Sequence, residues 1–105
     1  MVDTKDLVDA SPWHPMTDPV ALKHLGKFAE ELGECVAAVT RCIIQGIDEC
    51  EPVTGKPNRQ WLEDEIADVL AGANLVHEHF NLDDLRINVR KGRKIDHLRQ
   101  WHKMA

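Results

Sequence analysis

Two long helical patterns, joined by a segment rich in proline and glycine, constrain the fold of this chain more than any other feature. In each pattern the apolar residues recur at alternating spacings of three and four, which places them on one face of an α-helix. The joining segment, "DECEPVTGKPN" at residues 48–58, has the composition of a loop. No alternation typical of β-strands extends over a useful length, so we predict an all-α fold. The first stripe is Leu22, Leu25, Ala29, Leu32, Val36, Val39 and Ile43, and the second is Leu62, Ile66, Val69, Ala73, Val76 and Phe80.

Residues beside the stripes mark the ends of the expected helices. Asp18 followed by Pro19 is a typical helix start, because Asp caps the first turn and Pro needs no hydrogen bond there. Gly46 is a plausible end of the first helix, and Asn81 of the second. The segment "SPWHPM" contains two prolines and predicts an extended arm. We expect one domain over residues 1–105, with an arm at 1–17, a helical hairpin at 18–46 and 59–80, and a third helix at 83–103 with a possible interruption at Gly92.

Bulk composition disfavours several function classes. The net charge of -5 argues against a nucleic-acid binder, although "RINVRKGRK" at residues 86–94 is strongly basic. No apolar run approaches the length of a membrane span, and no signal peptide is recognisable. The three cysteines form no CxxC pair, which supports neither a disulfide framework nor a zinc ribbon. Free thiols suit a reducing cytosol, so we expect a cytoplasmic protein with no membrane or nucleic-acid partner.

Two pairs of carboxylates lie beside the apolar stripes. Glu31 and Glu34 are three residues apart in the first helix, as are Glu65 and Asp68 in the second, so each pair shares a helix face. The second pair leads into residues 69–76, which carry no charge. The second helix is apolar on two sides, so we expect other parts of the protein to cover both. The acidic face lies on one of these sides, so the four carboxylates would point into one enclosed space. Enclosed carboxylates without partners are costly, and Mg²⁺, which takes oxygen ligands and bridges to phosphates, would remove that cost.

The segments that carry these acids resemble a known family. "KFAEELGE" and "WLEDEIADVL" resemble the MazG-like, all-α nucleoside triphosphate pyrophosphohydrolases, whose hallmark is ExxE, a spacer and ExxD. The resemblance covers about residues 20–94, and it implies helical hairpins that pair between subunits into a four-helix-type bundle. We therefore expect a homo-oligomer, either a dimer or a tetramer. The family hallmark falls on Glu31, Glu34, Glu65 and Asp68.

The resemblance also implies a reaction and its cofactor. The four carboxylates would hold Mg²⁺, with Mn²⁺ as a substitute, and a nucleoside triphosphate would be hydrolysed to a nucleoside monophosphate and pyrophosphate. Phosphoryl chemistry needs positioning, charge neutralisation and a base for the attacking water. Glu31 and Glu34 are both candidates for that base. The basic third helix resembles the phosphate-binding region of the family, and its register leaves four candidates, which are Arg90, Lys91, Arg93 and Lys94.

Three further residues are candidates for substrate contacts, each with a structural alternative. Lys27 shares the face of Glu31 and would touch phosphate, or it would pair with Glu31 four residues on. Trp61, one turn before Glu65, would stack on a base or pack at the helix start. Asn74 would read a base edge or satisfy a loop carbonyl, because an amide among apolar residues needs a partner.

Two other function classes compete with the enzyme. One is a non-catalytic helical interaction module whose acidic face binds a basic partner. The uncharged stretch after Asp68 argues against it, because such a face should stay polar. The other is a nucleic-acid binder that uses "RKGRK", which the net charge and the short basic run disfavour. We therefore predict an Mg²⁺-dependent nucleotide pyrophosphohydrolase of the nucleotide-pool housekeeping type, whose base and sugar the sequence leaves open.

Overall fold

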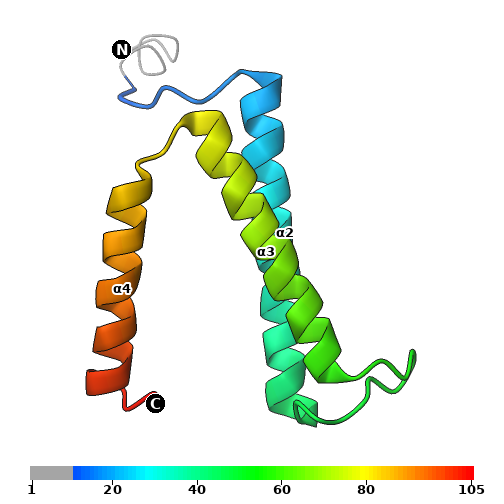
Figure 1. The fold of residues 1–105 in the computed structure, drawn as a ribbon. Helices are drawn as coiled ribbons and strands as arrows, with labels where there is room; N and C mark the ends of the chain where they lie inside the picture. The colour runs from blue at the N-terminus through cyan, green and yellow to red at the C-terminus, as the bar shows by residue number, and fades with distance from the viewer. Residues whose placement is uncertain (1–10) are drawn as a thin grey trace, which may run out of the picture.

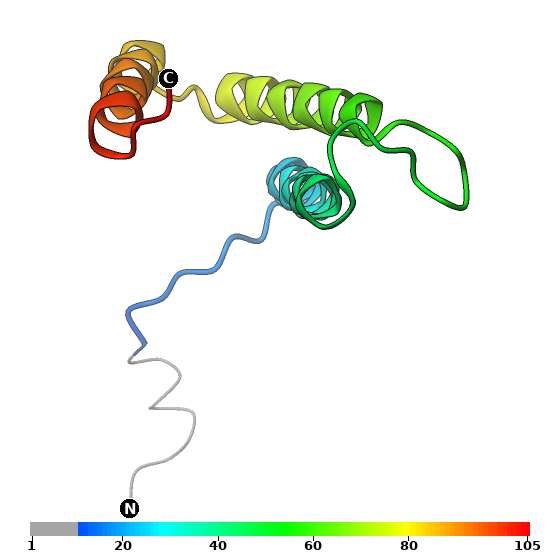
Figure 2. The same cartoon turned by 90° about the horizontal axis from the view of Figure 1, so that it is seen from below.

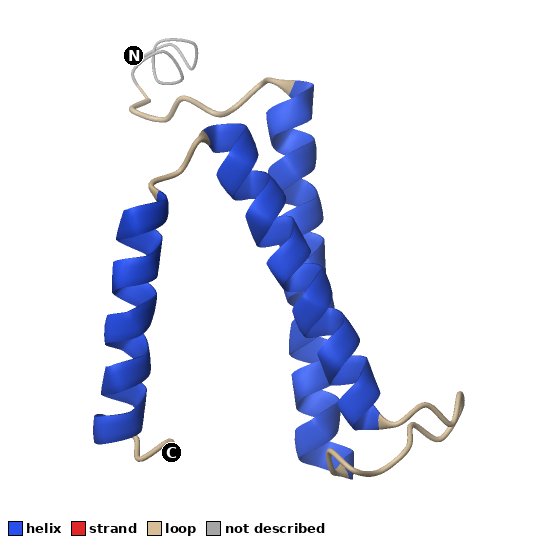
Figure 3. Ribbon diagram, in the orientation of Figure 1, coloured by secondary structure: helices blue, strands red, loops and turns tan. Residues whose placement is uncertain are grey.

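The computed structural model describes residues 11–105, and within them the chain is helical without a strand (Figures 1 and 3). The all-α prediction is confirmed for this part of the chain. Residues 11–17 form no helix, in agreement with the expected arm, whose residues 1–10 lie outside the described part. The helices are α2 (Pro19–Gln45), α3 (Asn58–Phe80) and α4 (Asp84–Trp101).

The helix ends follow the capping residues that the sequence indicates. The Asp18 side chain accepts a hydrogen bond from the backbone N–H of Val20 at 3.2 Å, and Pro19 opens α2. Asn81 ends α3 in the left-handed conformation, with φ of 50°, which asparagine tolerates better than most residues. Asp83 caps α4 through the backbone N–H of Arg86 at 2.9 Å. The expected interruption at Gly92 does not occur, since α4 continues through this residue.

Helices α2 and α3 form an antiparallel hairpin whose contact surface differs from the apolar stripe of α2 (Figure 1). Every large apolar residue of that stripe is exposed, including Val36 at 64% and Ile43 at 78%. The seam instead consists of the buried and half-buried residues that recur every three or four positions along both helices. They are Ala21, His24, Phe28, Glu31, Cys35, Ala38 and Cys42 in α2, and Asn58, Leu62, Glu65, Val69, Gly72, Val76 and Phe80 in α3.

Small residues in the seam let the two helices approach closely. A Cβ atom at Gly72 would lie 3.0 Å from Cδ1 of Phe28, so the Phe28 ring occupies the space that a side chain at position 72 would need. Ala21 and Ala38 are buried at other points of the seam. A close approach of this kind brings the polar members of the seam, Glu31 and Glu65, near one another.

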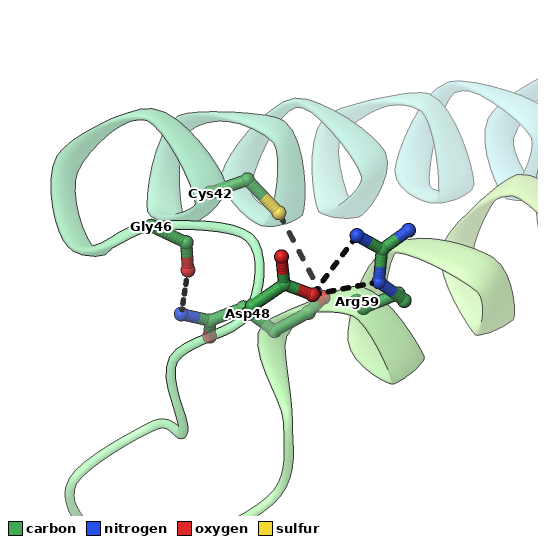
Figure 4. Close-up of polar contacts among 5 residues, drawn as sticks. Cys42, Gly46, Asp48 and Arg59 are labelled. Atoms are coloured by element: carbon green, nitrogen blue, oxygen red, sulfur yellow. Dashed lines mark hydrogen bonds and ion pairs between the residues drawn. The ribbon is translucent and has the colours of Figure 1, made fainter.

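The loop between α2 and α3 is held by Asn58, which is fully buried at 0% exposure. Its Nδ2 donates to the Gly46 carbonyl at 3.0 Å and to Oε1 of Gln45 at 3.1 Å, while its backbone carbonyl accepts a weak hydrogen bond from the Cys42 thiol. Figure 4 shows this junction together with the neighbouring ion pair between Arg59 and Asp48, 2.9 Å long. The first residue of α3 therefore ties down the end of α2.

Helix α4 stands apart from the hairpin, as the two perpendicular views show (Figures 1 and 2). None of its residues is buried. Near the start of α4, Oδ1 of Asp84 lies 3.7 Å from Nε2 of His77 on α3. The third predicted helix thus exists, but it does not cover the hairpin.

The described part of the chain is extended. Its radius of gyration is 19.6 Å, whereas a compact domain of this length has about 13 Å. The apolar residues that are buried within the described part are only Ala21, Ala38 and Val76. The expectation that both apolar sides of α3 would be covered is therefore not met within one chain. None of the helices in the described part combines the length and apolarity that crossing a bilayer requires.

Candidate metal centre

Three carboxylates from the two helices converge in the middle of the hairpin. One oxygen each of Glu31, Glu65 and Asp68 lies within 4.8 Å of the others, and this is the group of possible metal ligands found among residues 11–105. Glu31 comes from α2, and the other two come from α3. The antiparallel seam thus brings together one member of the first acidic pair and both members of the second.

The cluster is partly enclosed, and its charges are incompletely compensated. The side chain of Glu31 is only 20% exposed. Oε2 of Glu31 and Oε2 of Glu65 are both buried, and neither has a hydrogen-bond partner in the described part of the chain. Burial raises the pKa of the Glu31 carboxyl, and the nearby carboxylates of Glu34 and Asp68 raise it further. A cation would relieve both the desolvation and the repulsion.

Glu34, the fourth acid of the motif, lies outside this group of three. Its side chain is exposed, yet it is near enough to Glu31 to contribute to the raised pKa of that carboxyl. Lys27 lies on the same side of α2. Its Nζ is 3.1 Å from Oε2 of Glu30 and 3.8 Å from Oε1 of Glu31. The Lys27–Glu31 pair expected from their spacing is therefore present, and a stronger pair with Glu30 accompanies it.

A groove of about 420 Å³ extends along the hairpin from the carboxylate cluster. Glu31 and Asp68 line it, and its remaining walls are mostly apolar. Lys27 also borders the groove, so an anionic ligand bound there would meet a cation and the carboxylate cluster together. The other residues along the groove are Lys23, His24 and Phe28 from α2 and Ala71, Gly72 and Leu75 from α3.

Two histidines near the ends of the helices form a contact that the sequence analysis did not anticipate. The rings of His24 and His79 stack with their centroids 4.1 Å apart and their planes 12° from parallel. His24 Nδ1 lies 2.9 Å from the Val20 carbonyl, which fixes the orientation of the ring. The two residues are far apart in sequence, and only the register of the hairpin brings them together.

Comparison of the chain with models of protein families, with curated proteins and with solved structures finds no match.

The two residues proposed to read the base do not line the groove. Trp61 is half-buried, and its ring lies beneath two cations, with the Lys56 ammonium 4.1 Å and the Arg41 guanidinium 5.4 Å from its centroid. Asn74 is exposed, and its Nδ2 donates to Oε1 of Glu78 at 3.1 Å, one turn further along α3. The contact with Glu78 satisfies the Asn74 amide, whereas the buried Nε1 of Trp61 has no hydrogen-bond partner in the described part of the chain.

The four basic residues of α4 proposed to hold phosphate, Arg90, Lys91, Arg93 and Lys94, are all exposed. None of the residues that line the groove belongs to this helix. The structure thus separates the candidates on α4 from the carboxylates of the same chain, whereas Lys27 on α2 lies beside them.

Proposed function

We propose that this protein is an Mg²⁺-dependent pyrophosphohydrolase of the MazG-like kind. It would cleave a nucleoside triphosphate between the α and β phosphates, giving a nucleoside monophosphate and pyrophosphate. The proposal rests on one structural observation, the convergence of Glu31, Glu65 and Asp68 within 4.8 Å of one another. The ExxE and ExxD spacing of the acids, which resembles the hallmark of that family, supports it independently of the geometry.

The residues of the cluster fit a hard divalent cation. Such ions prefer carboxylate oxygens and keep some of their waters. The two buried oxygens without partners, on Glu31 and Glu65, are the atoms whose burial a cation would compensate. Glu31, Glu65 and Asp68 would hold the ion. When bound, it would neutralise phosphate charge and make a coordinated water more acidic.

Glu34 is the better placed of the two candidates for the general base. It lies one turn from Glu31 and outside the group of three, so its carboxylate stays free to accept a proton. In the proposed reaction one water molecule attacks the α-phosphorus and gives a proton to Glu34. The bond from this phosphorus to the oxygen that bridges to the β phosphate breaks, so pyrophosphate leaves and the monophosphate keeps the oxygen of the water. Lys27, at the edge of the groove, would attract the phosphates, although its pairing with Glu30 reduces its free charge.

The working form would be a homo-oligomer. The accessible surface of the chain is 8751 Å², whereas a compact monomer of this mass exposes about 6,000 Å². The excess is larger than the roughly 800 Å² that each partner buries in a standard interface. The exposed apolar stripe of α2, from Leu22 to Ile43, is the surface that pairing of hairpins would cover.

The reaction can be tested with the full-length protein and a panel of ribo- and deoxyribonucleoside triphosphates. We expect Mg²⁺-dependent release of pyrophosphate and monophosphate, and no activity in the presence of a chelator. Release of orthophosphate would refute the bond assignment but leave the metal site intact. Absence of turnover across the panel, with no Mg²⁺ binding by calorimetry, would refute the enzyme and favour a helical interaction module.

A further inference from the structure

The groove beside the carboxylate cluster changes in chemical character along its length. Glu31 and Asp68 line one end, and His24 lines the groove seven residues before Glu31, which is roughly 10 Å along α2. The walls between these ends are small or apolar, and they consist of Phe28, Ala71 and Gly72. A ligand that fills the groove would therefore be anionic at the end where a cation is bound, and mostly apolar toward His24.

The ring of His24 is held in place by two contacts. Its Nδ1 lies 2.9 Å from the backbone carbonyl of Val20, one turn earlier in α2. One face of the ring stacks on His79 of α3, with the centroids 4.1 Å apart, and the His79 ring in turn packs edge-on against Phe80. The first contact fixes the rotation of the His24 ring, and the second fixes its plane.

The contact with Val20 also decides which nitrogen of His24 carries the proton. A carbonyl oxygen only accepts hydrogen bonds, so Nδ1 must donate, and in a neutral imidazole Nε2 then has a lone pair and no hydrogen. Stacking favours neutral rings, because two charged rings 4.1 Å apart would repel each other. No hydrogen bond to Nε2 is found within residues 11–105. The far end of the groove therefore offers an oriented acceptor that the hairpin itself does not use.

The two lysines of the groove leave room for an uncharged base. Lys23 and Lys27 are both exposed, and Lys27 already pairs with Glu30 and Glu31, at 3.1 and 3.8 Å. Long side chains of this kind keep the ammonium group in water while the stem lies along an apolar surface. A base in the groove would contact the stems, and the ammonium groups would remain available to phosphates.

We propose that the nucleoside of the substrate lies in this groove and that its base carries an exocyclic amine, which donates a hydrogen bond to Nε2 of His24. The inference rests on the proposed function, in which the phosphates are held at the carboxylate cluster. Cytosine and adenine carry such an amine, whereas uracil, thymine and guanine carry a carbonyl oxygen at the corresponding position. A carbonyl oxygen beside Nε2 would leave two acceptors facing each other without a hydrogen between them, which disfavours these bases.

Matched pairs of substrates test the proposal most directly. Cytidine and uridine triphosphates differ in one exocyclic group of the base and in the proton on the adjacent ring nitrogen, and adenosine and inosine triphosphates differ in the same way. We expect kcat/KM with Mg²⁺ to be about 10- to 100-fold higher for the amino-bearing member of each pair. Equal values within both pairs, or a preference for the carbonyl-bearing members, would overturn the proposal.

Substitutions assign the preference to His24. His24→Phe keeps a ring that can stack on His79 but removes the acceptor, so the preference for the amino-bearing member should be lost. His24→Gln supplies an amide oxygen that can accept, so part of the preference should return. The matched control is His97→Phe, because His97 also stacks on an aromatic ring, that of Trp101 at 4.5 Å, but belongs to α4 and does not line the groove. The control should keep the wild-type preference, and a His24→Phe protein that keeps it as well would refute the role of His24.

A binding measurement separates the base site from the reaction. Calorimetry with Mg²⁺ and the α,β-methylene analogues of cytidine and uridine triphosphates reports affinity without turnover. Tighter binding of the cytidine analogue that is lost in His24→Phe supports the base site even if the wild type hydrolyses no nucleotide, in which case only the proposed function fails. Turnover without discrimination within the pairs overturns the base site and leaves the proposed function standing. Failure of the wild type to bind either analogue also overturns the base site.

Discussion

At the scale of single residues, the hairpin places acids where apolar side chains usually pack. Glu31 and Glu65 occupy seam positions whose neighbours along the same helices are Phe28, Cys35, Leu62 and Val69. An ionised carboxylate at such a position disfavours folding unless a cation or a donor compensates it. The folded hairpin should therefore be more stable when a cation is bound at these carboxylates than when none is bound.

Replacing Glu31 with Gln should stabilise the protein when no divalent cation is present. The folded pKa of Glu31 is raised above its ordinary value of 4.5. A raised pKa favours folding at low pH, and this contribution is lost as the pH rises through the folded pKa. In a chelator at neutral pH, Glu31→Gln should melt at a higher temperature than the wild type, and the difference should shrink as the pH falls toward 4.5. A lower melting temperature of the variant at neutral pH would contradict this account. Added Mg²⁺ should stabilise the wild type more than the variant.

Substitutions at Glu34 and Glu65 should separate catalysis from cation binding. Glu34→Gln removes the proposed base, so kcat should fall about 10²- to 10⁴-fold with Mg²⁺ affinity nearly unchanged. Glu65→Gln removes one of the three convergent carboxylates, so it should weaken Mg²⁺ binding as well as turnover. Calorimetric titration with Mg²⁺ and steady-state kinetics measure the two effects. Loss of cation binding in the Glu34 variant would assign Glu34 to the metal instead.

At the scale of elements, the α2–α3 connection depends on the buried amide of Asn58. Asn58→Ala removes two hydrogen bonds and leaves the Gly46 carbonyl without this donor. The expected loss of unfolding free energy is about 1–3 kcal/mol. Asn74→Ala is the matched control, because Asn74 is exposed in the middle of α3 and bonds only to Glu78 of its own helix among the contacts found. Denaturant titration should show a clear loss for the first variant and little change for the second. Equal stabilities would mean that Asn58 does not hold the loop.

At the scale of the whole molecule, the exposed stripe of α2 decides whether one chain can work alone. The α2–α3 hairpin buries little apolar surface, and the large apolar side chains of the α2 stripe remain exposed to solvent. Oligomerisation is the simplest way for such a chain to reach ordinary stability.

A charge placed in the stripe should dissociate the protein. In a monomer Val36, which is 64% exposed, would tolerate Glu with little change in stability. In an oligomer joined by the stripe, Val36→Glu would bury an unpaired charge, so sedimentation at micromolar concentration should show monomers and turnover should fall. Ala37→Glu is the control on a neighbouring exposed position outside the stripe. A wild type that sediments as a stable monomer would refute the oligomer.

The sequence by itself determined the local features of this protein. The residues Asp18, Gly46 and Asn81 marked helix ends, because capping effects act over a few residues. Helical periodicity showed which acids share a helix face. The three helices and the approach of Glu31 to Glu65 and Asp68 could therefore be predicted, whereas Glu34 lies outside this group of three.

Only the tertiary structure decided which faces meet. Periodicity indicates which side chains lie together on one face of a helix. It does not indicate which face packs against the neighbouring helix, because more than one face could do so. The strongest apolar stripe of α2 therefore suggested a core, yet the hairpin packs through a seam of small and mixed residues around Gly72 and Phe28. That choice of seam placed Glu31 and Glu65 inside, left Glu34 at the edge and turned Asn74 away from the groove. It also left α4 without a partner among residues 11–105, since long-range packing depends on the shapes of whole surfaces and not on spacing along the chain.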